Sequence, residues 1–177
     1  MTNVCFAGVT GWTAPPIIKA IDEADDLTLT AGVSRSAAGR PLSEVTGSGS
    51  GAVYASVAKA LEGAEIDVLV DYTSATAVRD NVWTAVEAGV HVVIGSSGLA
   101  ADDYAELDRL ARDNGVGVVA AGNFSVMAAI LRRAAAMAAE HVPQWEIIDY
   151  AADDKPTCPA GRLANLPRHS LTFVHPR

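Results

Sequence analysis

Short apolar runs alternate with helical patterns along most of the chain, and this alternation constrains the fold more than any other feature. Runs such as Ile66–Asp71 (IDVLVD) suit the buried strands of a parallel sheet, and the helical segments between them end at glycines such as Gly89 and Gly115. Strand–helix repetition of this kind predicts an α/β fold with a doubly wound parallel sheet. Ligands on such sheets bind beyond the carboxyl ends of the strands, so the segments that follow the strands form the candidate site.

The periodicity places each expected element. We expect strands at Asn3–Ala7, Leu27–Val33, Ile66–Asp71, Val90–Ile94, Gly117–Ala121 and Trp145–Tyr150. We expect helices at Pro15–Ala24, Val57–Leu61, Ala75–Ala88, Ala100–Asn114 and Ser125–His141. The segment Ser36–Gly51 is rich in glycine, serine and alanine, and we expect it to be a surface loop.

The composition excludes several classes of function. Hydrophobic residues make up 50% of the chain, and the net charge of −8 argues against nucleic acid as a partner, because phosphate binding needs a basic face. No apolar run approaches the ~20 residues that span a bilayer, and the N-terminus has no signal-peptide pattern. We therefore expect a cytoplasmic protein without a membrane partner. Cys5 and Cys158 stand alone in the sequence and indicate neither a metal site nor a disulfide framework.

The first expected strand is followed by a glycine-rich loop that opens a helix. The loop, Gly8–Ala14 (GVTGWTA), has the pattern G-x-x-G-x-x-A. Gly8 permits a tight turn, Gly11 lets backbone N–H groups approach a pyrophosphate, and Ala14 allows close packing of helix on strand. The helix N-terminus then faces the negative charge. A strand, this loop and a helix in that order predict a Rossmann-type dinucleotide-binding domain.

The second expected strand is followed by Ser34, Arg35 and Ser36. An NAD enzyme usually places an acidic residue here to hold the ribose hydroxyls, and this segment has none. A guanidinium flanked by two hydroxyls suits a 2′-phosphate, which arginine can bind through two parallel hydrogen bonds. The sequence therefore favours NADPH, with NADH as the alternative cofactor. A solvated loop arginine is the other interpretation of Arg35.

Small and hydroxyl-bearing residues also follow the later strands. Thr73 follows the expected strand Ile66–Asp71, and Gly95 to Ser97 follow the expected strand Val90–Ile94. Ala121 to Phe124 lie at the end of the expected strand Gly117–Ala121 and just beyond it. Several such loops at one edge of a sheet outline a cofactor groove. The predicted cofactor-binding residues are Gly8, Val9, Thr10, Gly11, Trp12, Thr13, Arg35, Thr73, Gly95, Ser96, Ser97, Ala121, Gly122, Asn123 and Phe124.

Together the motifs resemble the 4-hydroxy-tetrahydrodipicolinate reductase (dihydrodipicolinate reductase) family of bacterial lysine and diaminopimelate biosynthesis. The resemblance runs from Asn3 to about Pro156. Besides the glycine-rich loop, it rests on DYTSATA at Asp71–Ala77, VVIGSSG at Val92–Gly98 and AGNFSV at Ala121–Val126.

The resemblance implies hydride transfer from NAD(P)H to a small, cyclic, unsaturated dicarboxylate. It places the pyrophosphate at Gly8 to Thr13, the ribose phosphate at Arg35 and the nicotinamide at Gly95 to Ser97, with Ala121 to Phe124 closing the groove. It also implies a homotetramer. The domains implied are a Rossmann domain at 1–124, the start of an incomplete α+β substrate and oligomerisation domain at 125–156, and an irregular tail at 157–177.

The match weakens on the substrate side. Lys155 falls on the family's catalytic lysine, which donates a proton as the hydride arrives. Ala151 and Ala152 fall where the family has histidines, and alanine cannot donate a proton. Two alternatives therefore stay open: a nucleotide-binding module without catalysis, and a related reductase that acts on another imine or carbonyl substrate.

The segment after Pro156 also departs from the family. The family's D-x-P-S-G-T-A turn, which binds a substrate carboxylate, is replaced by TCPAGRLA at Thr157–Ala164. Suppose that Thr157–Pro167 are encoded by one permitted choice of synonymous codons. One base inserted in front of these codons then shifts the reading frame, and the translation changes from TCPAGRLANLP to DVPSGTARELA, which continues the family motif. We therefore expect a one-base deletion after the Pro156 codon, an out-of-frame tail, and weak or no turnover by the 177-residue chain.

Overall fold

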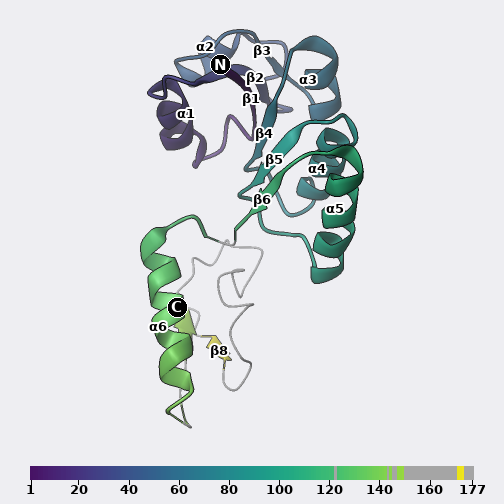
Figure 1. Cartoon of the computed structure of the whole chain (residues 1–177). Coiled ribbons are helices and arrows are strands. Elements are labelled where there is room, and N and C mark those ends of the chain that lie inside the picture. Colours follow the sequence, from purple (N-terminus) through teal and green to yellow (C-terminus); the bar gives the residue numbers. More distant parts are fainter. Residues whose placement is uncertain (122, 143, 145–146, 150–170, 174–177) are drawn as a thin grey trace. The chain divides into compact units, whose positions relative to one another are not determined.

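The computed structural model describes residues 1–121, 123–142, 144, 147–149 and 171–173 (Figure 1). The chain divides into two compact units, Met1–Ala120 and Ala121–Arg177. Within the described residues, the first unit holds a six-stranded sheet with its flanking helices, and the second holds one helix and a two-stranded sheet.

All six strands of the first unit run parallel, in the order β3-β2-β1-β4-β5-β6. The strands are β1 (Thr2–Ala7), β2 (Leu27–Val33), β3 (Ala52–Tyr54), β4 (Val68–Asp71), β5 (His91–Ile94) and β6 (Val118–Ala120). The order reverses at β1, because the chain winds from β1 to β3 and then crosses back to β4 on the other side of β1. The predicted doubly wound sheet is therefore confirmed, and sheets of this kind bind their ligands at the carboxyl ends of the strands beside such a reversal.

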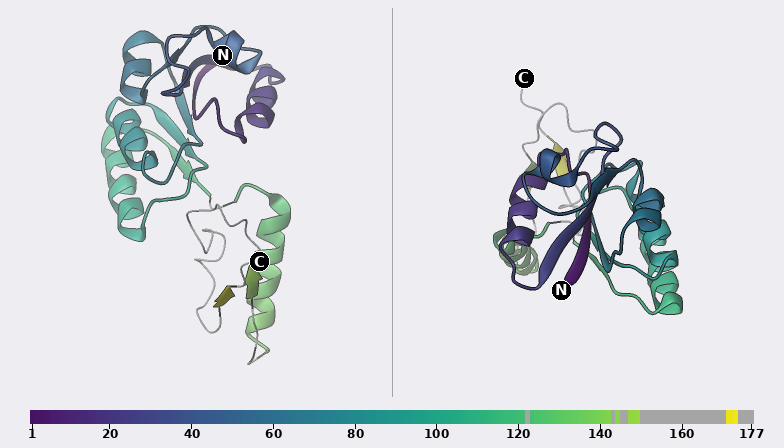
Figure 2. Two further views of the ribbon diagram at one scale, coloured as in Figure 1. Left: turned by 180° about the vertical axis from the view of Figure 1, so that it is seen from behind. Right: turned by 90° about the horizontal axis from the view of Figure 1, so that it is seen from above.

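Helices cover both faces of this sheet (Figures 1 and 2). They are α1 (Ala14–Asp22), α2 (Leu42–Thr46), α3 (Val57–Gly63), α4 (Val78–Glu87) and α5 (Ala101–Asn114). Successive side chains of a strand point to opposite faces. Val4 and Phe6 of β1 accordingly belong to the core under α1 and α2, and Cys5 and Ala7 belong to the core under α3, α4 and α5. A strand buried on both faces is apolar throughout, which explains why the sequence reveals it.

The segment after β2 differs from the expected surface loop. Helix α2 lies within Ser36–Gly51, and β3, which follows at once, pairs with β2. Leu42 is fully buried and anchors α2 on the core. Gly47 ends the helix with a φ of +82°. The expectation of a loop without secondary structure is therefore wrong, because the short helix is hidden among glycines and serines.

The remaining elements of the first unit agree with the expected ones apart from their ends. Helix α4 begins at Val78 because the residues before it form a turn, in which the Ser74 carbonyl accepts from the amides of Ala77 and Val78, each at 3.0 Å. Strand β4 begins at Val68, two residues after the expected start at Ile66.

The second unit contains α6 (Val126–Ala139), β7 (Ile147–Asp149) and β8 (Leu171–Phe173). The Ser125 hydroxyl caps α6 by accepting from the Ala128 amide at 3.4 Å. Strands β7 and β8 pair in parallel, and β8 lies within the segment 157–177 that we expected to be irregular. Among the described residues, no helix is both long enough and apolar enough to cross a membrane.

Candidate dinucleotide-binding site

The loop between β1 and α1 turns tightly at the carboxyl end of β1. Gly8 has a φ of +97°, and a Cβ atom there would overlap the carbonyl oxygen of Tyr72. The Gly11 amide donates to the Gly8 carbonyl at 2.8 Å, and a Cβ on Gly11 would lie 3.1 Å from that oxygen. Gly8 therefore has to be glycine, and Gly11 leaves little room for a side chain.

Three amides of this loop have no hydrogen-bond partner among the described residues: those of Thr10, Trp12 and Thr13. Helix α1 follows at once and carries Pro15 and Pro16 in its first turn. Because proline has no N–H, the donors at the positive end of this helix are the amides of the loop. Unpaired N–H groups beside a helix N-terminus can bind an anion.

A chain of hydroxyl groups joins this loop to the end of β2. Thr10 Oγ1 lies 3.0 Å from Ser34 Oγ, which lies 3.1 Å from Ser36 Oγ. The exposed Arg35 side chain makes no ion pair within the part of the chain that the structure describes. Its neighbour Arg40, in contrast, pairs with Glu44 at 3.7 Å. The two hydroxyl contacts use two of the three hydroxyl hydrogens, so the Arg35 guanidinium and one hydroxyl hydrogen are left to donate to a ligand.

Asp71, the last residue of β4, has the only buried charged side chain among the described residues. Its Oδ1 accepts from the Ser96 hydroxyl at 2.6 Å, the Thr73 hydroxyl at 2.8 Å and the Thr73 amide at 3.1 Å. Its Oδ2 accepts from the Asn81 side-chain amide at 2.8 Å. One carboxylate thus connects the loop after β4, helix α4 and the loop after β5.

Tyr72, in the loop after β4, packs on strand β1. Its ring stacks on Phe6 with a centroid distance of 5.9 Å and an interplanar angle of 7°. Burial raises the pKa of the Tyr72 hydroxyl.

The loops after β4 and β5 lie directly against each other. In the loop after β5, a Cβ atom on Gly98 would lie 2.5 Å from the Cα of Ala75, which belongs to the loop after β4. The absence of a side chain at Gly98 therefore permits this close approach.

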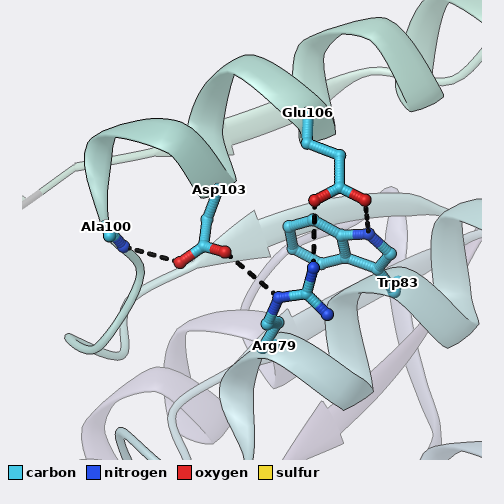
Figure 3. A network of polar contacts seen from close by, with 5 residues as sticks. All are labelled: Arg79, Trp83, Ala100, Asp103 and Glu106. Atoms are coloured by element: carbon cyan, nitrogen blue, oxygen red, sulfur yellow. Dashed lines mark hydrogen bonds and ion pairs between the residues drawn. The ribbon is translucent and has the colours of Figure 1, made fainter.

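A polar network between α4 and α5 holds the far end of the loop after β5 (Figure 3). Arg79 donates to Asp103 at 3.1 Å and to Glu106 at 3.0 Å, and its guanidinium lies 4.4 Å from the centroid of the Trp83 ring. Asp103 also accepts from the Ala100 amide at 2.8 Å. The Asp103 hydrogen bond raises the pKa of Arg79, and the Ala100 amide and then Arg79 lower the pKa of Asp103. The network fixes the point where the loop enters α5.

The structure brings the predicted cofactor residues of the first unit to the carboxyl ends of β1, β2, β4 and β5. Three of them differ in detail from the expectation. The buried Val9 directs its amide to the Val33 carbonyl at 3.3 Å and so offers no free donor. The Thr73 and Ser96 hydroxyls both donate to Asp71, so neither hydrogen is available to a ligand.

The remaining predicted site residues lie elsewhere. Ala121, Asn123 and Phe124 belong to the second unit, where Asn123 Oδ1 accepts from the Ser125 amide at 2.9 Å. Gly122 and Lys155 lie outside the described residues. Among the described histidines, cysteines and acidic residues, none form a group that could hold a metal ion.

Asp71 is the site residue that sequence reasoning missed. The only available signal is local: an aspartate ends an apolar strand, and a threonine stands two positions later, where its amide can close a turn on the carboxylate. The contacts with Asn81 and Ser96 come from segments that the sequence does not connect with Asp71.

The sheet topology and these loops define a Rossmann-type nucleotide-binding domain of the kind found in oxidoreductases. Comparison with known families gives a narrower assignment. The family described as "Dihydrodipicolinate reductase, N-terminus" matches residues 2–124. The chain belongs to this family.

Curated relatives carry the same family name. The 4-hydroxy-tetrahydrodipicolinate reductase of Syntrophomonas wolfei is 34% identical over 161 residues, which cover 90% of this chain and 60% of that protein. That of Synechococcus elongatus is 35% identical over 168 residues, which cover 89% of this chain and 61% of that protein. The chain therefore spans about 60% of the length of these relatives.

Solved structures share the fold. A dihydrodipicolinate reductase from Paenisporosarcina sp. TG-14, with dipicolinate bound, superposes with a TM-score of 0.71 at 24% identity and covers 93% of this chain and 63% of that one. A biliverdin reductase from Synechocystis sp. PCC 6803, in complex with biliverdin and NADP+, superposes with a TM-score of 0.60 at 20% identity and covers 75% of this chain and 42% of that one.

Proposed function

We propose that this chain binds NADPH across the carboxyl ends of β1, β2, β4 and β5, as the cofactor domain of a 4-hydroxy-tetrahydrodipicolinate reductase. The observation that carries the proposal is the free donor set at β1 and β2. It consists of the amides of Thr10, Trp12 and Thr13 and the Arg35 guanidinium, which have no partner among the residues that the structure describes. Amides beside a helix N-terminus suit a pyrophosphate, and a guanidinium suits a terminal phosphate.

The preference for NADPH rests on the end of β2. Ser34 occupies the region where an acidic residue would bind the ribose hydroxyls of NADH, and its hydroxyl is joined to those of Thr10 and Ser36. The Arg35 guanidinium and the one hydroxyl hydrogen that these contacts leave can donate to a phosphate, whereas a carboxylate would repel it. The residues present therefore fit a dinucleotide that carries a 2′-phosphate.

The reaction proposed is that of the curated relatives. When bound, NADPH supplies the hydride, and the acceptor is a small cyclic, unsaturated dicarboxylate. The loops after β4 and β5 lie on the opposite side of β1 from Arg35, so they are where the nicotinamide half of an extended dinucleotide would lie. The family resemblance assigns proton donation to Lys155.

Binding measurements with matched arginine variants test the cofactor assignment. Arg35→Ala should weaken NADPH binding about tenfold to a hundredfold, because a charge-assisted hydrogen bond is lost, and should leave NADH binding nearly unchanged. Arg40→Ala is the control, since Arg40 is a nearby arginine whose charge is paired with Glu44. Isothermal titration of the full chain gives both affinities. Equal losses for NADPH and NADH in Arg35→Ala would contradict the assignment.

A second candidate is a nucleotide-binding module without turnover. It is favoured by Ala151 and Ala152, which stand where the family resemblance places proton-donating histidines. The two candidates differ in one observable: both bind NADPH, but only the reductase oxidises it when the unsaturated dicarboxylate is added. A Lys155→Met variant distinguishes specific turnover from background oxidation, because it removes the proton donor and leaves the described binding loops intact.

A further inference from the structure

The carboxylate of Asp71 determines what two neighbouring hydroxyl groups can do. A hydroxyl has one hydrogen to donate and two lone pairs to accept with, and an ionised carboxylate can only accept. The Ser96 hydroxyl gives its hydrogen to Asp71 at 2.6 Å, and the Thr73 hydroxyl gives its hydrogen at 2.8 Å. Both oxygens are therefore left with accepting capacity only.

The remaining capacity of the two oxygens is unequal. Thr73 Oγ1 already accepts from the Asn81 side-chain amide at 3.3 Å, so one lone pair remains. Ser96 Oγ has no donor directed to it within the described part of the chain, so both of its lone pairs remain. Ser96 is thus the stronger free acceptor of the two, and it stands in the loop after β5.

We propose that Asp71 is a positioning residue that presents Ser96 Oγ, and secondarily Thr73 Oγ1, as acceptors for the carboxamide N–H groups of a nicotinamide ring. This inference rests on the proposed function, since it assumes that a nicotinamide dinucleotide binds here. Strands β4 and β5 lie across the sheet reversal from the phosphate-binding loop, which is where the nicotinamide half belongs. The carboxamide is the part of that ring with N–H donors to offer.

The geometry explains why a charged group is buried at this position. An uncompensated buried carboxylate is costly, but Asp71 accepts from hydroxyl and amide donors on both oxygens. In an Asp71→Asn variant, an NH2 group, which donates, would replace one of the two carboxylate oxygens, which accept. The Ser96 hydroxyl could then accept from that amide and turn its hydrogen outward, which would oppose a carboxamide N–H.

Three ligands separate this role from general stabilisation. NADPH has the carboxamide, its 3-acetylpyridine analogue has a ketone without N–H groups, and 2′-phospho-ADP-ribose lacks the ring. In the unmodified chain, NADPH should bind about fivefold more tightly than the acetylpyridine analogue, which corresponds to one hydrogen bond. In Asp71→Asn and in Ser96→Ala this preference should fall to about onefold, while 2′-phospho-ADP-ribose binds within about twofold of its original affinity.

Ser96→Ala keeps the test decisive if Asp71→Asn does not fold, because Ser96 is only partly buried. Thr84→Val is the control: it deletes a hydroxyl whose partner is the Asp80 carbonyl within α4, and it should leave all three affinities unchanged. An unchanged preference for NADPH in both site variants would overturn the inference, and so would an equal loss of all three ligands. If the unmodified chain binds none of the three ligands, the proposed function fails and the inference fails with it.

Discussion

The aromatic ring of Tyr72 occupies the space that a side chain on Gly95 would need. Gly95→Ala should therefore force the loop after β5 away from the ring and lower the free energy of unfolding by about 1–3 kcal/mol, as overpacked positions do. The loss should appear in urea denaturation monitored by circular dichroism.

Gly117→Ala is the matched control for this substitution. A Cβ at Gly117 would meet only Nδ1 of His91, at 3.5 Å, which is an ordinary contact distance. The control should therefore change the stability by less than about 0.5 kcal/mol. Equal stabilities for the two variants would show that Tyr72 can move away without cost.

The ion pair between α4 and α5 should give the chain a stability that depends on acid. The Ala100 amide and Arg79 hold the pKa of Asp103 below its ordinary value of 3.8. A group with a depressed folded-state pKa stabilises the fold above its unfolded-state pKa and loses this effect as the pH falls through the folded-state value. Relative to the unmodified chain, Asp103→Asn should lower the melting temperature by about one to three degrees at neutral pH. The difference should shrink as the pH falls below 3.8 and disappear below the depressed folded-state pKa of Asp103.

Asp102→Asn provides the control for the acid dependence. Asp102 is an exposed neighbour in the first turn of α5, and it makes no ion pair among the described residues. At neutral pH, Asp102→Asn should lower the melting temperature less than Asp103→Asn does. At low pH, the two variants should melt at nearly the same temperature. A melting difference for Asp103→Asn that persists unchanged into acid would contradict the role of the ionised carboxylate.

The Cys5 thiol should be unreactive in the folded chain. Burial, with a smaller contribution from the charge of Asp71, raises its pKa to about 12. At pH 8 only about one thiol in ten thousand would be ionised, and the thiolate is the reactive form. Iodoacetamide should therefore leave the Cys5 peptide unlabelled under native conditions and label it in guanidinium chloride. Rapid native labelling of that peptide, measured by mass spectrometry, would show that β1 opens easily.

Much of this fold can be predicted from the sequence, for a physical reason. Strand β1 is apolar and fully buried over residues 4–7, and β4 and β5 are apolar over residues 68–70 and 92–94, where full and partial burial alternate. Glycines also mark the ends of two of the helices, since Gly89 follows α4 and Gly115 caps α5. Helix α2 and strand β3 are hidden because they are short and because their single fully buried side chains, Leu42 and Val53, stand among glycines and serines. Tertiary contact, rather than local pattern, maintains these two elements.

The candidate site is predictable only in part. The positions of Gly8 and Arg35 follow from motif spacing, and the structure places both at the carboxyl edge of the sheet. The role of Asp71 depends on strands β4 and β5 lying side by side, which brings Ser96 to the carboxylate from 25 positions away. Spacing along one chain does not carry that information.

The expected reading-frame change after Pro156 is testable at the level of the gene. Resequencing across the Pro156 and Thr157 codons should reveal one missing base, and the restored frame should continue as DVPSGTARELA. A confirmed frame would remove this explanation for the loss of the family's turn and would favour the module without turnover.

The most direct test of the account is hydrogen–deuterium exchange of the full chain with and without NADPH. The amides of Thr10, Trp12 and Thr13 have no acceptor among the described residues, so they should exchange rapidly in the free chain. NADPH should slow exchange in the peptide that contains them and in the peptide that contains Ser34 to Ser36. Unchanged exchange in both peptides at saturating NADPH would contradict a dinucleotide site at β1 and β2.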